Sequence, residues 1–264
     1  MNNAIGVFDS GVGGLTVARE IMRQLPNETI YYFGDVKNCP YGDKTKEEII
    51  KNTDRAVKFL IDKGVKLVVL ACNTATAAAL DYLQNKYEVP IIGVVQPGAR
   101  RAIQATENNK VLVLGTKFTA NSKVYDIEIE NINSDIIVFD KACPAFVPFI
   151  ESEGNLNKEA TKNLIYDTLG NTNTLGVDTV VLGCTHYPIL KKDIEDYYGN
   201  NIKVISSGRE AAREVSTVLG YAKLHQKKLN KKEHRFFISE ESDNFNSIAS
   251  KWLKKDINAE VVEI

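Results

Sequence analysis

Two patterns of apolar residues alternate along the chain. Short uninterrupted apolar runs, such as residues 30–33 and 111–114, are typical of parallel strands that are buried on both faces. Between these runs, apolar residues recur at helical spacing, as in residues 15–25 and 46–63. Strands that alternate with helices predict an α/β protein with a mostly parallel sheet.

The apolar pattern predicts ten strands. They are expected at residues 5–8, 30–34, 89–94, 111–114, 136–139, 202–205, 235–239 and 259–264, and in the runs that end before Cys72 and Cys184. The expected helices are residues 15–25, 46–63, 74–86, 158–169, 209–224 and 243–254, with another that opens near Gly98.

One stretch of sequence occurs twice. Gly64 begins an apolar run that ends at Cys72, and 112 positions later Gly176 begins a similar run that ends at Cys184. Each cysteine is followed by residues with hydroxyl or amide side chains. Because open α/β sheets bind ligands at the carboxyl ends of their strands, each copy is expected to present a thiol at a ligand site.

The chain contains further landmarks of a duplication. Thr116 follows a strand as Ser10 does, 106 positions earlier, and Cys143-Pro144 repeats Cys39-Pro40 at an offset of 104. These near-constant offsets favour two pseudo-symmetric α/β domains over a chance similarity of buried strands. We therefore expect two facing half-sites, one in each domain.

Composition is that of an ordinary globular protein. The 264 residues are 44% hydrophobic and 25% charged, with a formal net charge of −1, which suggests neither a nucleic-acid nor a membrane partner. No apolar run approaches the roughly 18 residues of a membrane span, and Asp9 interrupts the only N-terminal apolar stretch. Four cysteines without C-x-x-C spacing indicate reduced thiols and a cytoplasmic location.

A single cysteine at a strand end is usually a small buried hydrophobe. Two cysteines at equivalent positions, Cys72 and Cys184, instead favour reactive thiols. A helix that begins after each would concentrate unpaired N–H groups there and stabilise a thiolate. Cys39 and Cys143 precede prolines in loops and are expected to be structural.

Metal and nucleotide sites are the main alternatives. Structural zinc favours paired ligands at short spacing, and Cys184-x-His186 alone is a weak match, so no metal site is expected. Gly11-x-Gly13-Gly14 resembles part of a phosphate loop, but Asp9 would repel a phosphate there. A zwitterion fits better, because Asp9 can face an ammonium group while backbone N–H groups hold a carboxylate.

Two equivalent thiols suit the inversion of a stereocentre. Proton transfer through a carbanion needs a base on one face of the carbon and an acid on the other, with the roles exchanged in the reverse reaction. Acyl transfer needs only one nucleophile with its base. A redox dithiol needs its sulfurs within disulfide distance, which leaves no room for a substrate.

Several motifs together resemble the glutamate racemase family, a branch of the pyridoxal-phosphate-independent aspartate/glutamate racemase superfamily. They are Asp9-Ser10-Gly11, Cys39-Pro40-Tyr41-Gly42, Cys72-Asn73-Thr74, Gly183-Cys184-Thr185-His186-Tyr187-Pro188, Gly115-Thr116, Phe146-Val147-Pro148 and the helix from Phe245 to Trp252. The resemblance extends from about residue 4 to 255. Gln96 stands where the family often has an acidic residue.

The resemblance implies roles for individual residues. Cys72 would take the α-proton from D-glutamate and Cys184 from L-glutamate. Asp9, Glu151 and His186 would assist proton transfer, with Glu153 as the alternative to Glu151. The substrate-binding residues would be Asp9, Ser10, Tyr41, Gly42, Asn73, Thr74, Thr185 and His186, with Thr116 nearby.

The resemblance also implies an architecture and a function. Residues 1–97 with 210–264 would form the first domain and 98–209 the second, with the active site in the cleft between them. The activity would be cofactor-independent racemisation of glutamate, which supplies D-glutamate for bacterial peptidoglycan. The alternatives are a racemase of aspartate or another small amino acid, and an inactive protein that binds a dicarboxylate. Glutamate is the expected partner, without nucleic acid or membrane, and a homodimer and a secondary protein-binding role are left open.

Overall fold

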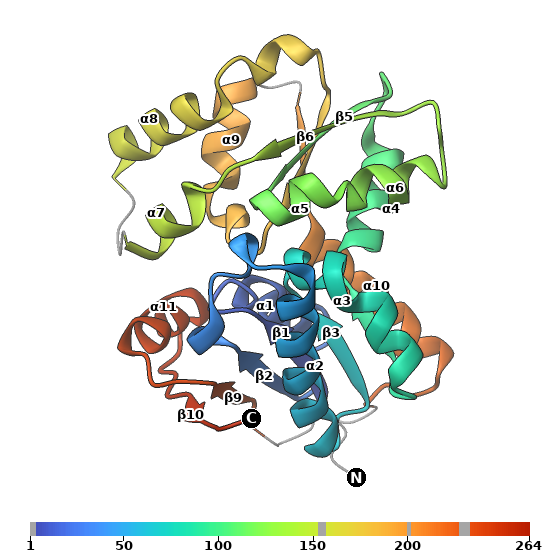
Figure 1. Ribbon diagram of the computed structural model, residues 1–264, viewed down its shortest axis with the longest axis vertical. Coiled ribbons are helices and arrows are strands. Elements are labelled where there is room, and N and C mark those ends of the chain that lie inside the picture. The colour runs from blue at the N-terminus through green and yellow to red at the C-terminus, as the bar shows by residue number, and fades with distance from the viewer. Residues whose placement is uncertain (1–3, 153–156, 200–201, 227–232) are drawn as a thin grey trace. The chain divides into compact units, whose positions relative to one another are not determined.

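The computed structural model describes residues 4–152, 157–199, 202–226 and 233–264 of the chain. The chain forms two compact units, Met1–Val94 with Gly208–Ile264, and Val95–Ser207. Each unit contains its own parallel β-sheet, with helices in the connections between strands (Figure 1). The prediction of an α/β fold with mostly parallel sheets is confirmed.

The first unit contains a sheet of six strands in the order β10-β9-β2-β1-β3-β4. These strands are β1 (Ile5–Asp9), β2 (Ile30–Gly34), β3 (Leu67–Leu70), β4 (Ile91–Gly93), β9 (Arg235–Ile238) and β10 (Glu260–Val261). The helices are α1 (Leu15–Gln24), α2 (Lys46–Asp62), α3 (Asn73–Lys86), α10 (Ser207–Tyr221) and α11 (Asp243–Leu253), with short 3-10 helices η1 (Val36–Asn38) and η2 (Tyr41–Asp43).

The second unit contains a sheet of four strands in the order β6-β5-β7-β8. These strands are β5 (Lys110–Gly115), β6 (Ile137–Ala142), β7 (Thr179–Gly183) and β8 (Lys203–Ser206). The helices are α4 (Val95–Ala105), α5 (Lys117–Ser122), α6 (Val124–Glu130), α7 (Phe146–Ser152), α8 (Lys158–Leu169) and α9 (Lys191–Tyr198), with 3-10 helices η3 (Thr172–Leu175) and η4 (Tyr187–Leu190).

The two sheets share a strand order. In chain order, the first four strands of each unit are arranged second, first, third, fourth: β2-β1-β3-β4 in one and β6-β5-β7-β8 in the other. Cys72 follows the third strand of the first unit, and Cys184 follows the third strand of the second. The common order supports the duplication that the repeated sequence predicts.

The segments after the two cysteines differ. Helix α3 begins directly after Cys72, whereas Cys184 is followed by the four-residue 3-10 helix η4 and only then by α9. The helix expected after each thiol is present, but α9 does not begin directly after Cys184 as α3 does after Cys72. Pro188 lacks the amide N–H that would donate to the carbonyl of Cys184 in a regular helix beginning at Thr185, which explains the difference.

Other departures from the predicted elements are small. Strand β10 is only Glu260–Val261, shorter than the expected 259–264, and β6 begins one residue late and continues to Ala142. Helices α5, α6 and α7 were not predicted. They are six or seven residues long, too short to show a helical period clearly.

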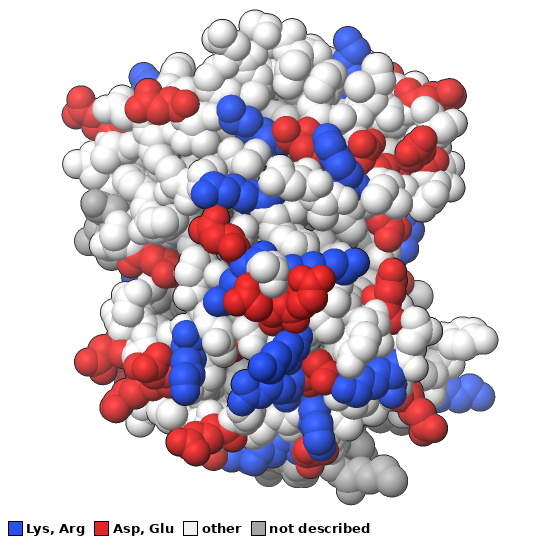
Figure 2. All heavy atoms as spheres, viewed as in Figure 1, with Lys and Arg blue, Asp and Glu red and all other residues white. Residues whose placement is uncertain are grey.

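Charged side chains of both signs are mixed on the surface. On the face shown in Figure 2, Lys and Arg alternate with Asp and Glu, and neither sign forms a broad continuous area among the described residues. In the described ranges, no helix has the length and apolar character needed to cross a membrane.

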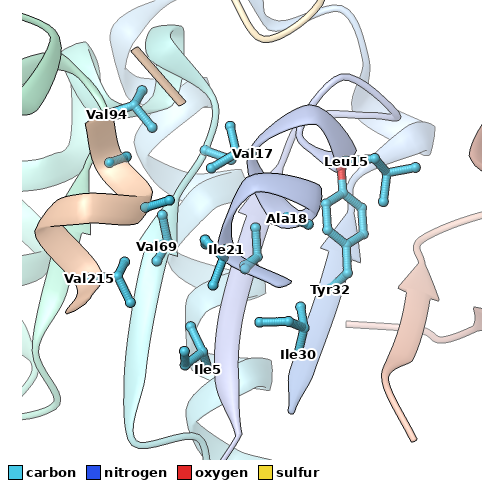
Figure 3. Packing of buried hydrophobic residues seen from close by; sticks show 14 of the residues in the cluster. Ile5, Leu15, Val17, Ala18, Ile21, Ile30, Tyr32, Val69, Val94 and Val215 are labelled. Atoms are coloured by element: carbon cyan, nitrogen blue, oxygen red, sulfur yellow. The ribbon is translucent and has the colours of Figure 1, made fainter. Parts of the chain in front are cut away.

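One hydrophobic cluster of the first unit joins its sheet to the helices α1 and α10. Ile5 and Val69 of adjacent strands pack with Ile21 of α1 and Val215 of α10, as Figure 3 shows. All four side chains are buried. Burying an aliphatic side chain of this size contributes roughly 1.5–3 kcal/mol, so this layer holds α1 and α10 against the sheet.

A buried ion pair in the first segment of the first unit also forms hydrogen bonds to the second segment. Lys66 Nζ lies 2.6 Å from Glu28 Oε2, and their side chains are only 7% and 2% exposed. Lys66 also donates to the carbonyl of Leu224 at 2.6 Å, and Glu28 Oε1 accepts from the backbone N–H of Gln226 at 2.8 Å. These charges therefore attach the chain after α10 to the first half of the unit.

We predict that Glu28→Ala strongly destabilises the protein. The substitution leaves the Lys66 ammonium buried without its partner, which lowers the free energy of unfolding by about 3–5 kcal/mol in urea denaturation. Asp62→Ala is the control, because the Lys58–Asp62 pair at 2.7 Å is more than 60% exposed on both sides and should leave the urea midpoint unchanged. Equal midpoints for the two variants would contradict the prediction.

Candidate active site

The residues singled out in the sequence form one group in each unit. In the first unit, Asp9 ends β1, Ser10 follows it, and Cys72 follows β3. In the second, Cys184 follows β7 and Glu151 lies on α7. The remaining candidates are Tyr41 and Gly42 in η2, Asn73 and Thr74 in the first turn of α3, and Thr185 and His186 directly after Cys184. Glu153, the alternative to Glu151, lies outside the described residues.

Cys72 is the N-cap residue of α3. Its Sγ accepts a hydrogen bond from the backbone N–H of Ala75 at 3.5 Å, and it lies 3.7 Å from Ser10 Oγ. An N–H donor and the positive end of a helix dipole both stabilise negative charge on sulfur. The first unit therefore provides a buried thiol in surroundings that favour its reactive form.

Asp9 lies in a tightly packed turn. Its buried carboxylate accepts from the backbone N–H of Gly11 at 3.0 Å, and the hydroxyl of Tyr32 donates to the Gly11 carbonyl at 2.6 Å. A Cβ on Gly14 would lie 2.4 Å from the Cβ of Asp9 and 2.8 Å from the Tyr32 hydroxyl. Gly14 has φ −60°, so a lack of space rather than an unusual backbone angle requires glycine there.

Tyr41 is bonded to a buried carboxylate that the sequence analysis missed. Its hydroxyl donates to Asp35 Oδ2 at 2.6 Å, and the Asn38 amide donates to the same carboxylate at 3.0 and 3.1 Å. Burial, and then the charge of Asp35, raise the pKa of Tyr41 well above its ordinary value, so its hydroxyl remains a donor. One signal was available: Asp35 follows the end of β2 much as Ser10 follows the end of β1.

In the second unit, three side chains form a hydrogen-bonded chain. His186 Nδ1 lies 3.9 Å from Cys184 Sγ, and His186 Nε2 lies 2.8 Å from Glu151 Oε1. His186 and Cys184 are buried, and the Glu151 side chain is 28% exposed. A carboxylate that holds one ring nitrogen leaves the other directed at the sulfur, which is the arrangement that activates a thiol through an imidazole.

The imidazole of His186 holds its proton strongly. Burial lowers its pKa, but the hydrogen bonds and charges of Cys184 and Glu151 outweigh burial and raise the pKa to about 10. At neutral pH the ring is an imidazolium that can stabilise a thiolate. Because the folded-state pKa exceeds the ordinary 6.5, the stabilisation from this proton is complete below about pH 6.5 and disappears as pH rises toward 10.

The other two thiols differ from this pair. Burial raises the pKa of Cys143 to about 12, so its thiol stays neutral. Cys39 is half-buried in the loop between η1 and η2, beside Gly11. Within the described ranges, no three His, Cys, Asp or Glu side chains are arranged to hold a metal ion.

The sequence of this chain matches a known family. The Asp/Glu/hydantoin racemase family model matches residues 5–215, and the chain belongs to this family. Glutamate racemase from Staphylococcus haemolyticus (strain JCSC1435) is 47% identical over 264 residues, which cover 100% of this chain and 99% of that protein.

Solved structures agree with this assignment. Glutamate racemase isoform RacE1 from Bacillus anthracis is 40% identical with a TM-score of 0.95, over 99% of this chain and 98% of that one. Glutamate racemase from Francisella tularensis in complex with D-glutamate is 34% identical with a TM-score of 0.91, again over 99% and 98%.

We predict that His186 titrates far above an ordinary histidine. In nitrogen NMR spectra of protein labelled in its three histidines, the His186 ring should lose its proton near pH 10. His234 is the internal control, because burial and then Lys255 lower its pKa below 6.5. In Glu151→Gln, the loss of the carboxylate charge should lower the His186 value. A wild-type His186 that is neutral at pH 7 would contradict the prediction.

Proposed function

We propose that this protein is a cofactor-independent glutamate racemase that interconverts L- and D-glutamate. One observation carries the proposal: two sheets with the same strand order each present a thiol after the third strand, at Cys72 and Cys184. Stereoinversion by proton transfer needs such a pair. The full-length similarity to glutamate racemases supports glutamate over other amino acids.

The reaction proceeds by two proton transfers. With L-glutamate, the Cys184 thiolate removes the α-proton, so that the C–H bond breaks, an S–H bond forms and the electron pair remains on the α-carbon. The Cys72 thiol then gives its proton to the opposite face of that carbon and becomes a thiolate. D-glutamate reacts in the reverse order, and no oxidant or reductant is consumed.

The surroundings of each thiol suggest how it is activated. At Cys72, the amide of Ala75 donates to the sulfur, and the hydroxyl of Ser10, which accepts from the thiol at 3.7 Å, can turn to donate once the sulfur is anionic. At Cys184, the His186 imidazolium does so, oriented by Glu151. Asp9 assists proton transfer beside Cys72 and can face the substrate ammonium group.

The remaining candidate residues are assigned to binding. Their hydroxyl, amide and backbone groups are suited to hold the two carboxylates and the ammonium group of glutamate. They are Ser10, Tyr41, Gly42, Asn73, Thr74, Thr185 and His186. For Tyr41, the hydroxyl proton is already donated to Asp35, which assigns Tyr41 to shaping the site rather than donating that proton to an anion.

The cellular role follows from the product. D-glutamate is a component of bacterial peptidoglycan, so the enzyme would supply cell-wall synthesis from the cytoplasmic pool of L-glutamate. The four free thiols suit a reducing compartment.

We predict racemisation of L-glutamate without added cofactor. The purified protein should abolish the optical rotation of an L-glutamate solution, and the activity should survive dialysis against EDTA without pyridoxal phosphate. D-aspartate and L-aspartate serve as the comparison substrates. Faster turnover of aspartate would overturn the substrate assignment, and binding of glutamate without turnover would overturn the activity.

We predict that each of the two thiols is indispensable in both directions. Cys72→Ala and Cys184→Ala should each abolish nearly all racemisation of either enantiomer, and the double variant should be little worse, since residues that act as a unit are strongly non-additive. Cys39→Ser and Cys143→Ser are the matched controls and should keep most activity. Activity within about tenfold of wild type in either alanine variant, only about 1.4 kcal/mol of barrier, would rule the mechanism out.

A further inference from the structure

Tyr187 follows the Cys184-Thr185-His186 turn and is fully buried. Its hydroxyl lies 2.9 Å from the carbonyl oxygen of Cys143 and 3.1 Å from that of Gly115. Gly115 ends β5, and Cys143 directly follows β6. One hydroxyl therefore connects the ends of two neighbouring strands to the turn that carries the thiol.

Tyr187 also contacts the turn and the helix that carries Glu151. Its backbone N–H donates to the carbonyl of Cys184 at 3.2 Å, which closes the turn. Its ring meets Phe146 edge to face, with ring centroids 5.1 Å apart and an interplanar angle of 77°. Phe146 is the first residue of α7, so the ring fixes one end of the helix on which Glu151 lies.

The hydroxyl is held as a donor. Burial raises the pKa of Tyr187 well above its ordinary value, and the charge of a Cys184 thiolate raises it further. The group therefore has a single proton to share between two backbone oxygens and none to exchange with a substrate. Its contribution is geometric.

We propose that Tyr187 is a positioning residue, which sets the placement of Cys184, His186 and Glu151 relative to one another and thereby the proton transfer at Cys184. This inference rests on the proposed racemisation. Reactive groups that are misplaced by as little as 1 Å can lose up to about a hundredfold in rate, so a side chain that fixes three elements at once has a large effect on chemistry.

Tyr187→Phe tests the proposal, because it keeps the ring on Phe146 and removes only the hydroxyl. The expected result is a fall in kcat of about tenfold or more with KM for glutamate changed less than about twofold, as for a loss confined to the transition state. The value of kcat/KM should fall by the same factor for L- and D-glutamate. The two enantiomers have equal free energy, so the equilibrium constant is one, and this constant is the ratio of the two kcat/KM values.

Isotope effects identify which of the two proton transfers, at Cys184 or at Cys72, has become slower. When the Cys184 step becomes slower, the primary deuterium isotope effect on L-[2-²H]glutamate should rise toward its intrinsic value, whereas that on D-[2-²H]glutamate should fall toward one. A merely structural loss, which reduces the amount of folded enzyme, changes neither. Unchanged isotope effects at a lowered kcat would therefore overturn the proposal.

Tyr32→Phe is the matched control. Tyr32 is equally buried, and its hydroxyl donates to the carbonyl of Gly11 in the turn after β1 of the first unit. The substitution removes the same group from a comparable backbone bond, so it should lower the melting temperature similarly without raising the isotope effect on L-[2-²H]glutamate. The same rise in both variants would overturn a role specific to Cys184.

A second readout does not depend on turnover. Alkylation by iodoacetamide, followed by mass spectrometry of the cysteine peptides, gives the rate at Cys184 relative to Cys72 in the same sample. In Tyr187→Phe the His186 imidazolium is no longer held beside Cys184, so less of Cys184 is thiolate. Because the thiolate is the nucleophile, alkylation of Cys184 should be at least about threefold slower relative to alkylation of Cys72. An unchanged or increased ratio would overturn the proposal.

These measurements separate the two hypotheses. A wild-type protein that does not racemise glutamate contradicts the proposed function, while the alkylation ratio still decides the role of Tyr187. If Tyr187→Phe does not fold, Phe146→Leu loosens the ring contact without touching the hydroxyl. It should shift the alkylation ratio and the isotope effects in the same direction, and a wild-type ratio in that variant would count against the proposal.

Discussion

The parallel direction of the strands is the constraint on which the rest of this structure depends. In each unit every strand pair is parallel, so all the carboxyl ends of a sheet lie at one edge. The strands β1, β3 and β7 are buried along their whole length, and their only charged side chain is that of Asp9, the last residue of β1. Polar side chains are therefore concentrated where the strands end, and both thiols are found there.

Both thiols lie at the carboxyl end of a parallel sheet, but their neighbours differ. Cys72 is bonded to the first turn of a helix, whereas Cys184 faces an imidazole held by a carboxylate. The difference begins with Pro188, which prevents a regular helix from following Cys184 directly. A charged side chain in the second unit thus occupies the electrostatic role that backbone dipoles have in the first. Two halves with a common strand order therefore surround their cysteines with different groups.

Local sequence predicted the strands, most helices and the positions of both thiols, because buried runs and their polar ends are encoded within a few residues. The pairing of Tyr41 with Asp35 and of Tyr32 with Gly11 was not predicted. The Tyr41 bond depends on the path of the segment between β2 and α2, which brings together residues six positions apart. The Tyr32 bond depends on the register of β1 against β2, which aligns Asp9 with Gly34, and no local pattern specifies that register. The Tyr187 bonds have the same cause, since their two acceptors lie 72 and 44 positions earlier in the chain.

The insertion of the second unit into the first has a consequence for synthesis on the ribosome. Strand β2 is paired on one side by β1 and on the other by β9, which is formed by residues near the end of the chain. During translation the backbone groups of β2 on that side have no partner until residues 235–238 have emerged. The nascent first unit therefore exposes the edge of an apolar strand throughout the synthesis of the second, and such an edge is a site for intermolecular pairing. The nascent protein is most vulnerable to aggregation in this interval, and completion of the C-terminal segment ends it.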